Sequence, residues 1–328
     1  MKVVITGGTG FLGLALARRL LSRGALTGPS GALEPIDQMV LFDVAAPAGR
    51  PHGLDERVRI VAGQISDPDR VRALIDRDDV AVFHLASIVS GEGEQSFDLA
   101  MSVNLDGTRH LLGACRARAS RPRVVFASSI AVFGGDLAPA TVGDTVKQTP
   151  QTTYGVTKAI GELLINDYSR KGFLDGRSAR LPTVIVRPGK PNKAASSFAS
   201  GVFREPLNGE TCILPVRPET VMPVLGFRTA VENMIRLHEL DAVQLGTDRA
   251  VGLPSLDVTV VQMIESLRRV AAGRRLGEIR VERDPFIERI VAGWPVSTDS
   301  ARAAALGLAA DDSLDSIVQA YIEDFLPD

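Results

Sequence analysis

A glycine-rich segment directly after the first apolar run constrains the fold of this chain more than any other feature. Residues 3–5 predict a strand, and residues 6–13, with the sequence TGGTGFLG, lead into a helical pattern of apolar residues. Glycines in such a turn let the backbone approach a pyrophosphate, and the following helix N-terminus presents unpaired N–H groups to the phosphates. A tight turn that binds nothing would also need glycines, but the strand before and the helix after favour a bound dinucleotide.

Short apolar runs alternate with helical patterns through the first half of the chain. The runs cover residues 3–6, 39–43, 58–62, 80–86, 123–128 and 183–187. They are continuously apolar, which is typical of parallel strands covered by helices on both faces. The helical patterns cover residues 67–77, 95–119, 153–171, 229–239, 258–272 and 313–325, and the Gly/Pro-rich residues 24–31 predict a surface loop. We therefore expect an α/β fold with a Rossmann-type doubly wound parallel sheet.

The pattern changes after Arg187, where prolines at 188, 191, 206, 215, 218 and 223 interrupt the chain. Proline removes a ladder donor and is excluded from helix interiors, so we expect an irregular region that carries substrate loops. The sequence thus predicts a dinucleotide-binding domain at 1–188. A smaller, mainly substrate-binding lobe follows at 189–328, and part of it can return to the first domain.

Composition excludes several classes of partner. The net charge is −2 with acidic and basic residues mixed throughout, so a nucleic-acid surface is not expected. No apolar run approaches the roughly 18 residues of a membrane helix, and the first strand begins at once, so we expect a cytoplasmic protein without membrane contact. The two cysteines form no CxxC pair and the four histidines are scattered, which implies no metal.

Asp43 ends the second predicted strand, where a carboxylate can accept hydrogen bonds from the adenosine ribose. A carboxylate there repels the 2′-phosphate of NADP, so Asp43 favours NAD. An aspartate that merely ends a strand is the simpler alternative.

Tyr154 and Lys158 carry the strongest chemical signal, because a spacing of four places them on one helix face. A tyrosine that acts as a base at neutral pH needs a pKa roughly 3 units below its ordinary value, or ~4 kcal/mol. A neighbouring ammonium together with an oxidised nicotinamide can supply that. The same pair could be a solvated helix face, but Ser128 and Ser129 end the fifth strand nearby in the predicted sheet, although both serines could simply cap a loop.

At this point the chain resembles the extended short-chain dehydrogenase/reductase superfamily, that is, the NAD-dependent epimerase/dehydratases. The resemblance rests on six motifs in order: TGGTGFLG at 6–13, Asp43, HLAS at 84–87, NLDGT at 104–108, SSIAVFG at 128–134 and YGVTK at 154–158. It implies NAD as cofactor, catalysis by Ser129, Tyr154 and Lys158 with Asn104 in support, and a homodimer paired through helices 95–119 and 153–171. The residues that it implies for cofactor binding are Gly7, Gly10, Phe11, Leu12, Gly13, Asp43, Gln64, Ile65, Leu85, Ala86, Ser87, Asn104, Ser128, Tyr154, Lys158, Pro188 and Gly189. Gln64 departs from the family, which often has an aspartate there, and this puts the adenine contact in doubt.

The segment after Arg187, with the pattern RPGKPN, AASSF and REPLNG, resembles the D-erythronate dehydrogenase branch of that superfamily. The resemblance implies oxidation of the 2-hydroxyl of a short sugar acid to a 2-oxo acid. Candidate substrate-binding residues are Ser90, Ser129, Tyr154, Lys190, Asn192, Ser196, Ser197, Arg204 and Arg217, because a small carboxylate needs a cation and hydroxyl partners. Each arginine could instead form a surface ion pair. The alternatives are a nucleotide-sugar epimerase or dehydratase that retains its hydride, and a non-catalytic NAD(H) sensor.

Overall fold

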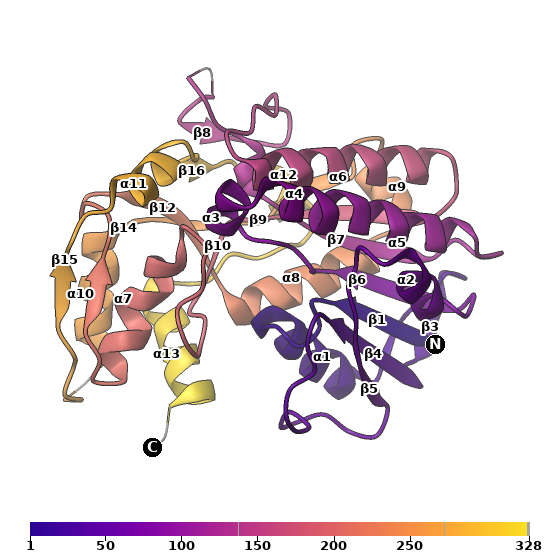
Figure 1. The fold of residues 1–328 in the computed structure, drawn as a ribbon, viewed down its shortest axis with the longest axis horizontal. Helices are drawn as coiled ribbons and strands as arrows, with labels where there is room; N and C mark the ends of the chain where they lie inside the picture. Colours follow the sequence, from indigo (N-terminus) through magenta and orange to yellow (C-terminus); the bar gives the residue numbers. More distant parts are fainter. Residues whose placement is uncertain (137, 272, 327–328) are drawn as a thin grey trace.

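A parallel seven-stranded sheet forms the centre of the molecule (Figure 1). The structure is a computed structural model and describes residues 1–136, 138–271 and 273–326. The strands are β1 (Lys2–Thr6), β4 (Gln38–Asp43), β5 (Val58–Ala62), β6 (Val80–His84), β7 (Arg123–Ser129), β9 (Asp175–Leu181) and β13 (Ala250–Gly252), in the order β13-β9-β7-β6-β1-β4-β5. All seven are parallel, so the predicted α/β Rossmann-type sheet is confirmed. The strand order reverses between β1 and β6, and ligands bind beyond the carboxyl ends of the strands at such a point.

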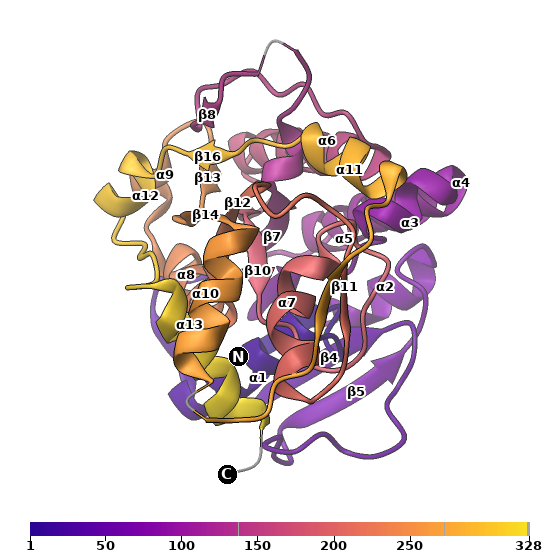
Figure 2. The same ribbon diagram turned by 90° about the vertical axis from the view of Figure 1, so that its left-hand side faces the viewer.

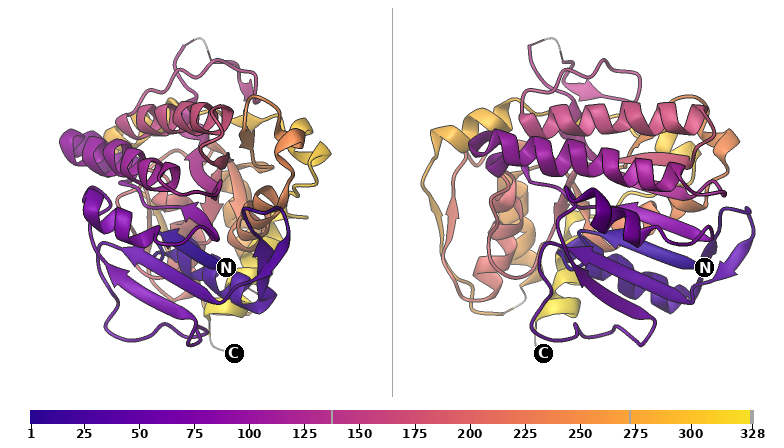
Figure 3. Two further views of the ribbon diagram at one scale, coloured as in Figure 1. Left: turned by 90° about the vertical axis from the view of Figure 1, so that its right-hand side faces the viewer. Right: turned by 45° about the vertical axis from the view of Figure 1, so that its right-hand side comes forward.

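Helices cover both faces of this sheet. One face carries α2 (Pro68–Leu74), α5 (Gly107–Arg116) and α6 (Thr153–Arg170), and α5 and α6 lie side by side (Figure 3). The other face carries α1 (Phe11–Arg23) and α8 (Phe227–Glu239). Side chains alternate between the two cores: Val3 and Ile5 pack with α1, whereas Val4 packs on the opposite face. Among the residues that the structure describes, no helix is both long and apolar enough to span a membrane.

The sixth strand of the sheet differs from the prediction. Residues 183–187 were expected to form it, but β10 (Thr183–Ile185) belongs to a separate sheet with β12 (Val221–Gly226) and β14 (Leu256–Thr259). The large sheet instead uses β9, whose sequence DGRSARL is polar. Its charged side chains are buried as ion pairs, including Arg177 with Asp175 at 2.6 Å, so no apolar run marks this strand.

Two further expectations are corrected. Residues 24–31 are not wholly loop, because β2 (Ala25–Thr27) pairs with β3 (Leu33–Pro35). The helix expected at 95–119 is broken at Ser96, and the chain forms α3 (Ser90–Gln95), α4 (Phe97–Ala100), a π-helical turn at Met101–Asp106 and then α5. Such turns are often found at functional sites, and this one carries Asn104.

A second apolar core lies beyond the carboxyl ends of the sheet. It packs α7 (Ser197–Leu207), α10 (Val260–Val270) and α13 (Leu314–Phe325), which stand together in Figure 2. The region expected to be irregular therefore contains a helix, α7, whose Pro206 lies in the last turn. The same body holds β11 (Cys212–Leu214) paired with β15 (Ile279–Val281). The chain then runs through α11 (Pro285–Ala292), β16 (Ser297–Thr298) and α12 (Ala301–Ala305), and β16 pairs with β8 (Thr141–Val142). The remaining short helix, α9 (Ala242–Leu245), precedes β13.

Candidate active site

The glycine-rich turn is packed too closely for side chains. Gly7 has φ +67°, and a Cβ on Gly13 would lie 2.4 Å from the Gly7 carbonyl oxygen. Helix α1 begins after Gly10, and among the described residues no side chain caps it and none in its first turn is acidic. Its free N–H groups therefore suit an anion, and these residues fit the pyrophosphate of a dinucleotide.

Gly13→Ala is expected to weaken dinucleotide binding at least about tenfold, because overpacking against backbone atoms costs about 1–3 kcal/mol and the turn must shift. Fluorescence titration with NADH measures the affinity. Gly113→Ala is the matched control: a Cβ there meets nothing within 4 Å in helix α5. This control should leave binding unchanged and gain about 0.5–1 kcal/mol of stability. Equal NADH affinity in the two variants would contradict the assignment of the turn.

Asp43 is held at the end of β4 beside this turn. Its Oδ2 accepts a hydrogen bond from the Thr9 N–H at 3.0 Å, and its Oδ1 accepts one from the Val44 N–H at 2.8 Å. Each carboxylate oxygen keeps a lone pair for a ribose hydroxyl. Of the adjoining candidates, Gln64 is exposed, whereas Ile65 is buried against Gly107 in α5.

The segment after β6 is anchored by a buried hydrogen-bond chain through His84. Thr108 donates its hydroxyl proton to the Asn104 carbonyl at 2.5 Å, so it accepts from His84 Nε2 at 3.0 Å. His84 Nδ1 then accepts from the Thr6 hydroxyl at 2.6 Å. Burial lowers the pKa of His84 to about 3, so the ring is neutral and structural. The chain fixes the backbone at Ala86, whose N–H donates to the Thr6 hydroxyl, next to the glycine turn.

Asn104 joins this segment to helix α6. Its Oδ1 accepts from the Ile88 N–H at 2.7 Å, and its Nδ2 donates to the Ile88 carbonyl at 3.1 Å and to the Thr157 hydroxyl at 3.2 Å. The side chain is buried and fully engaged within the protein. Asn104 therefore acts as a positioning residue for α6.

Ser129, Tyr154 and Lys158 come together where β7 ends and α6 begins. The Ser129 hydroxyl hydrogen-bonds the Tyr154 phenol. The Lys158 ammonium donates to the Ala127 carbonyl at 2.7 Å and lies 5.5 Å from the centre of the Tyr154 ring. Helix α6 approaches this closely because Gly155 has no side chain: a Cβ there would lie 2.1 Å from a carbonyl oxygen of the turn after β7.

Burial acts on both ionisable groups of this trio. It raises the pKa of the Tyr154 phenol above its ordinary value of 10, and the hydrogen bond from Ser129 opposes that shift. It lowers the pKa of Lys158 from 10.5 to about 7, against the attraction of Glu162. A further positive charge beside the phenol would favour phenolate.

Lys158→Met is expected to stabilise the cofactor-free protein at pH 6. The folded pKa of about 7 lies below the unfolded value of 10.5, so the buried ammonium destabilises the fold below pH 7, and this penalty fades as the pH rises to 10.5. The gain is at most about 5 kcal/mol at pH 6 and smaller at pH 9. Urea unfolding at both pH values measures it, with the exposed Lys171→Met as control. A gain independent of pH would contradict the explanation.

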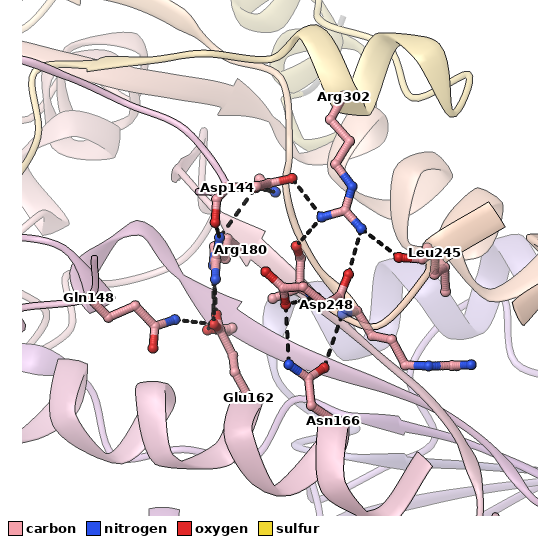
Figure 4. Close-up of polar contacts among 12 residues, drawn as sticks. Asp144, Gln148, Glu162, Asn166, Arg180, Leu245, Asp248 and Arg302 are labelled. Atoms are coloured by element: carbon pink, nitrogen blue, oxygen red, sulfur yellow. Dashed lines mark hydrogen bonds and ion pairs between the residues drawn. The ribbon is translucent and has the colours of Figure 1, made fainter. Parts of the chain in front are cut away.

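Ser128 belongs to a buried polar network next to the trio (Figure 4). Its hydroxyl donates to Glu162 Oε1 at 2.5 Å, and the Arg180 guanidinium binds the same carboxylate with Nη2 at 2.8 Å from Oε2. Gln148 also donates to Glu162, and Arg180 reaches Asp144 at 3.3 Å. The Ser128 hydroxyl is thus engaged away from any ligand. The sequence analysis did not identify Glu162, although its spacing of four after Lys158 was a usable signal.

A cavity of about 170 Å³ lies against Ser129 and Tyr154. It brings together four of the expected substrate residues, namely Ser90, Ser129, Tyr154 and Ser196. Its other lining residues are Val89, Ile130, Ala131, Leu181, Pro182, Thr183, Val184, Ala194 and Trp294. The sequence analysis missed Thr183 and Trp294, and no local pattern in the sequence marks either one.

The remaining expected substrate residues do not line this cavity. Lys190, Asn192 and Arg217 are exposed, and the Ser197 hydroxyl accepts from the Asn192 N–H at 3.2 Å. Arg204 is buried, paired with Glu205 at 2.5 Å and donating to the Arg187 carbonyl at 2.9 Å. The structure therefore places the expected cations away from Tyr154.

Comparison with known proteins gives a consistent family. The family model described as NAD dependent epimerase/dehydratase family matches residues 3–239. The D-erythronate dehydrogenases of Cupriavidus necator and Haemophilus influenzae are 52% and 44% identical, over 99% and 98% of this chain and 98% and 99% of theirs.

Solved structures agree with this fold. A structure titled as the nucleoside-diphosphate-sugar epimerase from Agrobacterium tumefaciens is 42% identical, with a TM-score of 0.90 over 99% of this chain and 94% of that one. A GalE-like L-threonine dehydrogenase from Cupriavidus necator, at 24% identity and a TM-score of 0.85 over 99% of both chains, shows the fold alone.

Proposed function

This chain belongs to the NAD dependent epimerase/dehydratase family, and from that premise we propose that it oxidises the 2-hydroxyl of a short sugar acid, D-erythronate first, to the 2-oxo acid. It is an NAD-dependent dehydrogenase, as are its relatives at 44–52% identity by name. The observation that carries the choice of substrate is the cavity at Ser129 and Tyr154. Its volume of about 170 Å³ has room for roughly six water molecules, which suits a four-carbon acid.

The residues of the chain divide the work as follows. The glycine turn and Asp43 would hold the pyrophosphate and the adenosine ribose, and Lys158 would hold the nicotinamide ribose with its two uncommitted N–H groups. NAD, when bound, supplies the acceptor for the hydride that leaves C2 of the acid. Ser129 orients the 2-hydroxyl oxygen, and Tyr154 accepts its proton at the phenol oxygen. The Lys158 charge favours the phenolate.

A panel of four- to six-carbon sugar acids and nucleotide sugars, scored by NADH absorbance, tests this function. D-Erythronate should give NADH at the highest kcat/KM. No NADH with any acid, combined with thermal stabilisation by nucleotide sugars, would contradict the proposal.

The epimerase alternative is favoured by one observation and opposed by another. A second cavity of about 760 Å³ adjoins the first and is large enough for a nucleotide. The charged side chains among its described lining residues are Glu94, Asp136 and Arg289, two carboxylates to one guanidinium. A diphosphate needs the opposite balance, so we keep the sugar acid as substrate.

We also propose a homodimer through the outer surface of α4 and α6. Phe97, Leu99, Val156 and Leu163 are exposed there, and Leu163 is 63% exposed. Leu163→Arg is expected to shift the protein to monomers in analytical ultracentrifugation, because a charge in an apolar interface is costly. Leu33→Arg, at a similarly exposed position on β3, should not. A dimer that persists in the first variant would refute this interface. A cytoplasmic location stays a prediction from the sequence.

A further inference from the structure

Trp294, the only tryptophan of the chain, forms a wall between two cavities. It lines the small cavity together with Ser129 and Tyr154, and it also lines the large one together with Gln151 and Arg289. The small cavity therefore ends at the indole ring on the side that faces the second cavity.

Backbone contacts fix this wall in place. The Trp294 N–H donates to the Val291 carbonyl at 3.0 Å, where α11 ends. Gly134, which follows β7, allows the segment to dock, because a Cβ there would lie 2.5 Å from the Gly293 carbonyl oxygen. The wall is thus pressed directly against the turn that carries Ser129.

The indole nitrogen of Trp294 has no hydrogen-bond partner among the described residues, although it is buried from solvent. An indole N–H can only donate, and an unpaired buried donor is costly. The oxygens of a ligand in the cavity are the partners that would satisfy it.

The cavity offers a sugar acid neutral donors. Within the described part of its lining, no lysine, arginine or histidine occurs. The Ser90 hydroxyl accepts from the Ala195 N–H at 3.3 Å, which leaves its own proton free to donate. Thr183 and Ser196 add two further hydroxyls. Among these donors the indole N–H is the one that has no acceptor within the protein.

We propose that Trp294 is a substrate-binding residue that determines specificity: its Nε1–H donates to an oxygen of the sugar acid, and its ring limits the length of the acid. This inference rests on the proposed function and names a residue and a size limit for it. The reaction itself stays with Ser129, Tyr154 and Lys158.

Trp294→Phe separates the hydrogen bond from the wall, because it removes the N–H and keeps an aromatic ring. We expect KM for D-erythronate to rise about tenfold or more, with kcat changed only a few-fold and NADH affinity unchanged. Phe286→Leu is the control, since Phe286 lines only the larger cavity; its KM should stay at the wild-type value. An unchanged KM in Trp294→Phe would overturn the hydrogen bond.

Trp294→Ala tests the wall. Joining the two cavities is expected to raise kcat/KM for six-carbon acids relative to D-erythronate by at least about tenfold, since a lost side chain opens that volume. A ratio equal to that of the wild type would overturn the size limit.

Fluorescence gives a readout that does not depend on turnover. Because Trp294 is the only tryptophan, D-erythronate added to the NAD-loaded Tyr154→Phe variant should change the emission in a saturable way. An emission that does not change would contradict the contact. Wild-type protein that releases no NADH from any acid would refute the proposed function instead, so the two failures are distinguishable.

Discussion

Tyr154→Phe is expected to lower kcat with D-erythronate by about 10²–10⁴-fold, the usual contribution of a positioned proton-transfer group. The phenol oxygen is the atom that takes the hydroxyl proton, and phenylalanine keeps the ring beside the Lys158 ammonium. NADH release under saturating NAD measures the rate. NADH affinity and the unfolding midpoint should stay close to wild type, because the hydrogen bond to Ser129 is the interaction of the phenol that is lost.

Tyr168→Phe is the matched control for this variant. Tyr168 lies on the same helix, α6, where its ring packs 5.7 Å from that of Phe173, far along the chain from Ser129. Its removal should leave kcat unchanged. Equal rates in the two variants would remove Tyr154 from the proton transfer.

Glu162→Gln is expected to destabilise the protein by about 3–5 kcal/mol, the range for a buried ion pair that loses one partner. Glu162 and Arg180 are only 2% and 3% exposed, and the variant leaves the guanidinium buried without that carboxylate. Urea unfolding with a two-state fit measures the loss.

Two comparisons separate this effect from a general loss of charge. Glu232→Gln breaks the exposed pair with Arg19, so it should cost less than about 1 kcal/mol. The double variant Glu162→Leu with Arg180→Met removes both buried charges and should recover much of the stability. A single variant as stable as the wild type would show that the pair is not the source of stability.

Strands with apolar runs were predictable, and the polar strand was not. Residues 58–62 form a strand with the predicted bounds, because an apolar run in a doubly covered sheet has one stable place. Strand β9 escaped because the partners of its charges come from distant segments: Arg180 pairs with Glu162 on α6, and Asp175 pairs with Arg249 before β13. Periodicity cannot register a charge whose partner lies far along the chain.

The candidate site was predictable to a similar degree. The spacing of Tyr154 and Lys158, together with the strand end at Ser129, located three groups that the fold brings together. Arg204 was misleading, because its charge is paired with the neighbouring Glu205 inside the second core. Trp294 reaches the cavity only through the docking of Gly293 on Gly134, a contact across some 160 residues that no local pattern encodes.

That docking also bears on how enzymes of this shape diversify. The groups assigned to proton transfer are encoded before residue 160, whereas the ring that bounds the cavity is encoded near the other end of the gene. Mutation or recombination in the later portion therefore leaves the redox apparatus intact while it alters which acid is accepted. Descendants of one ancestor are free to acquire new diets without having to reinvent the chemistry.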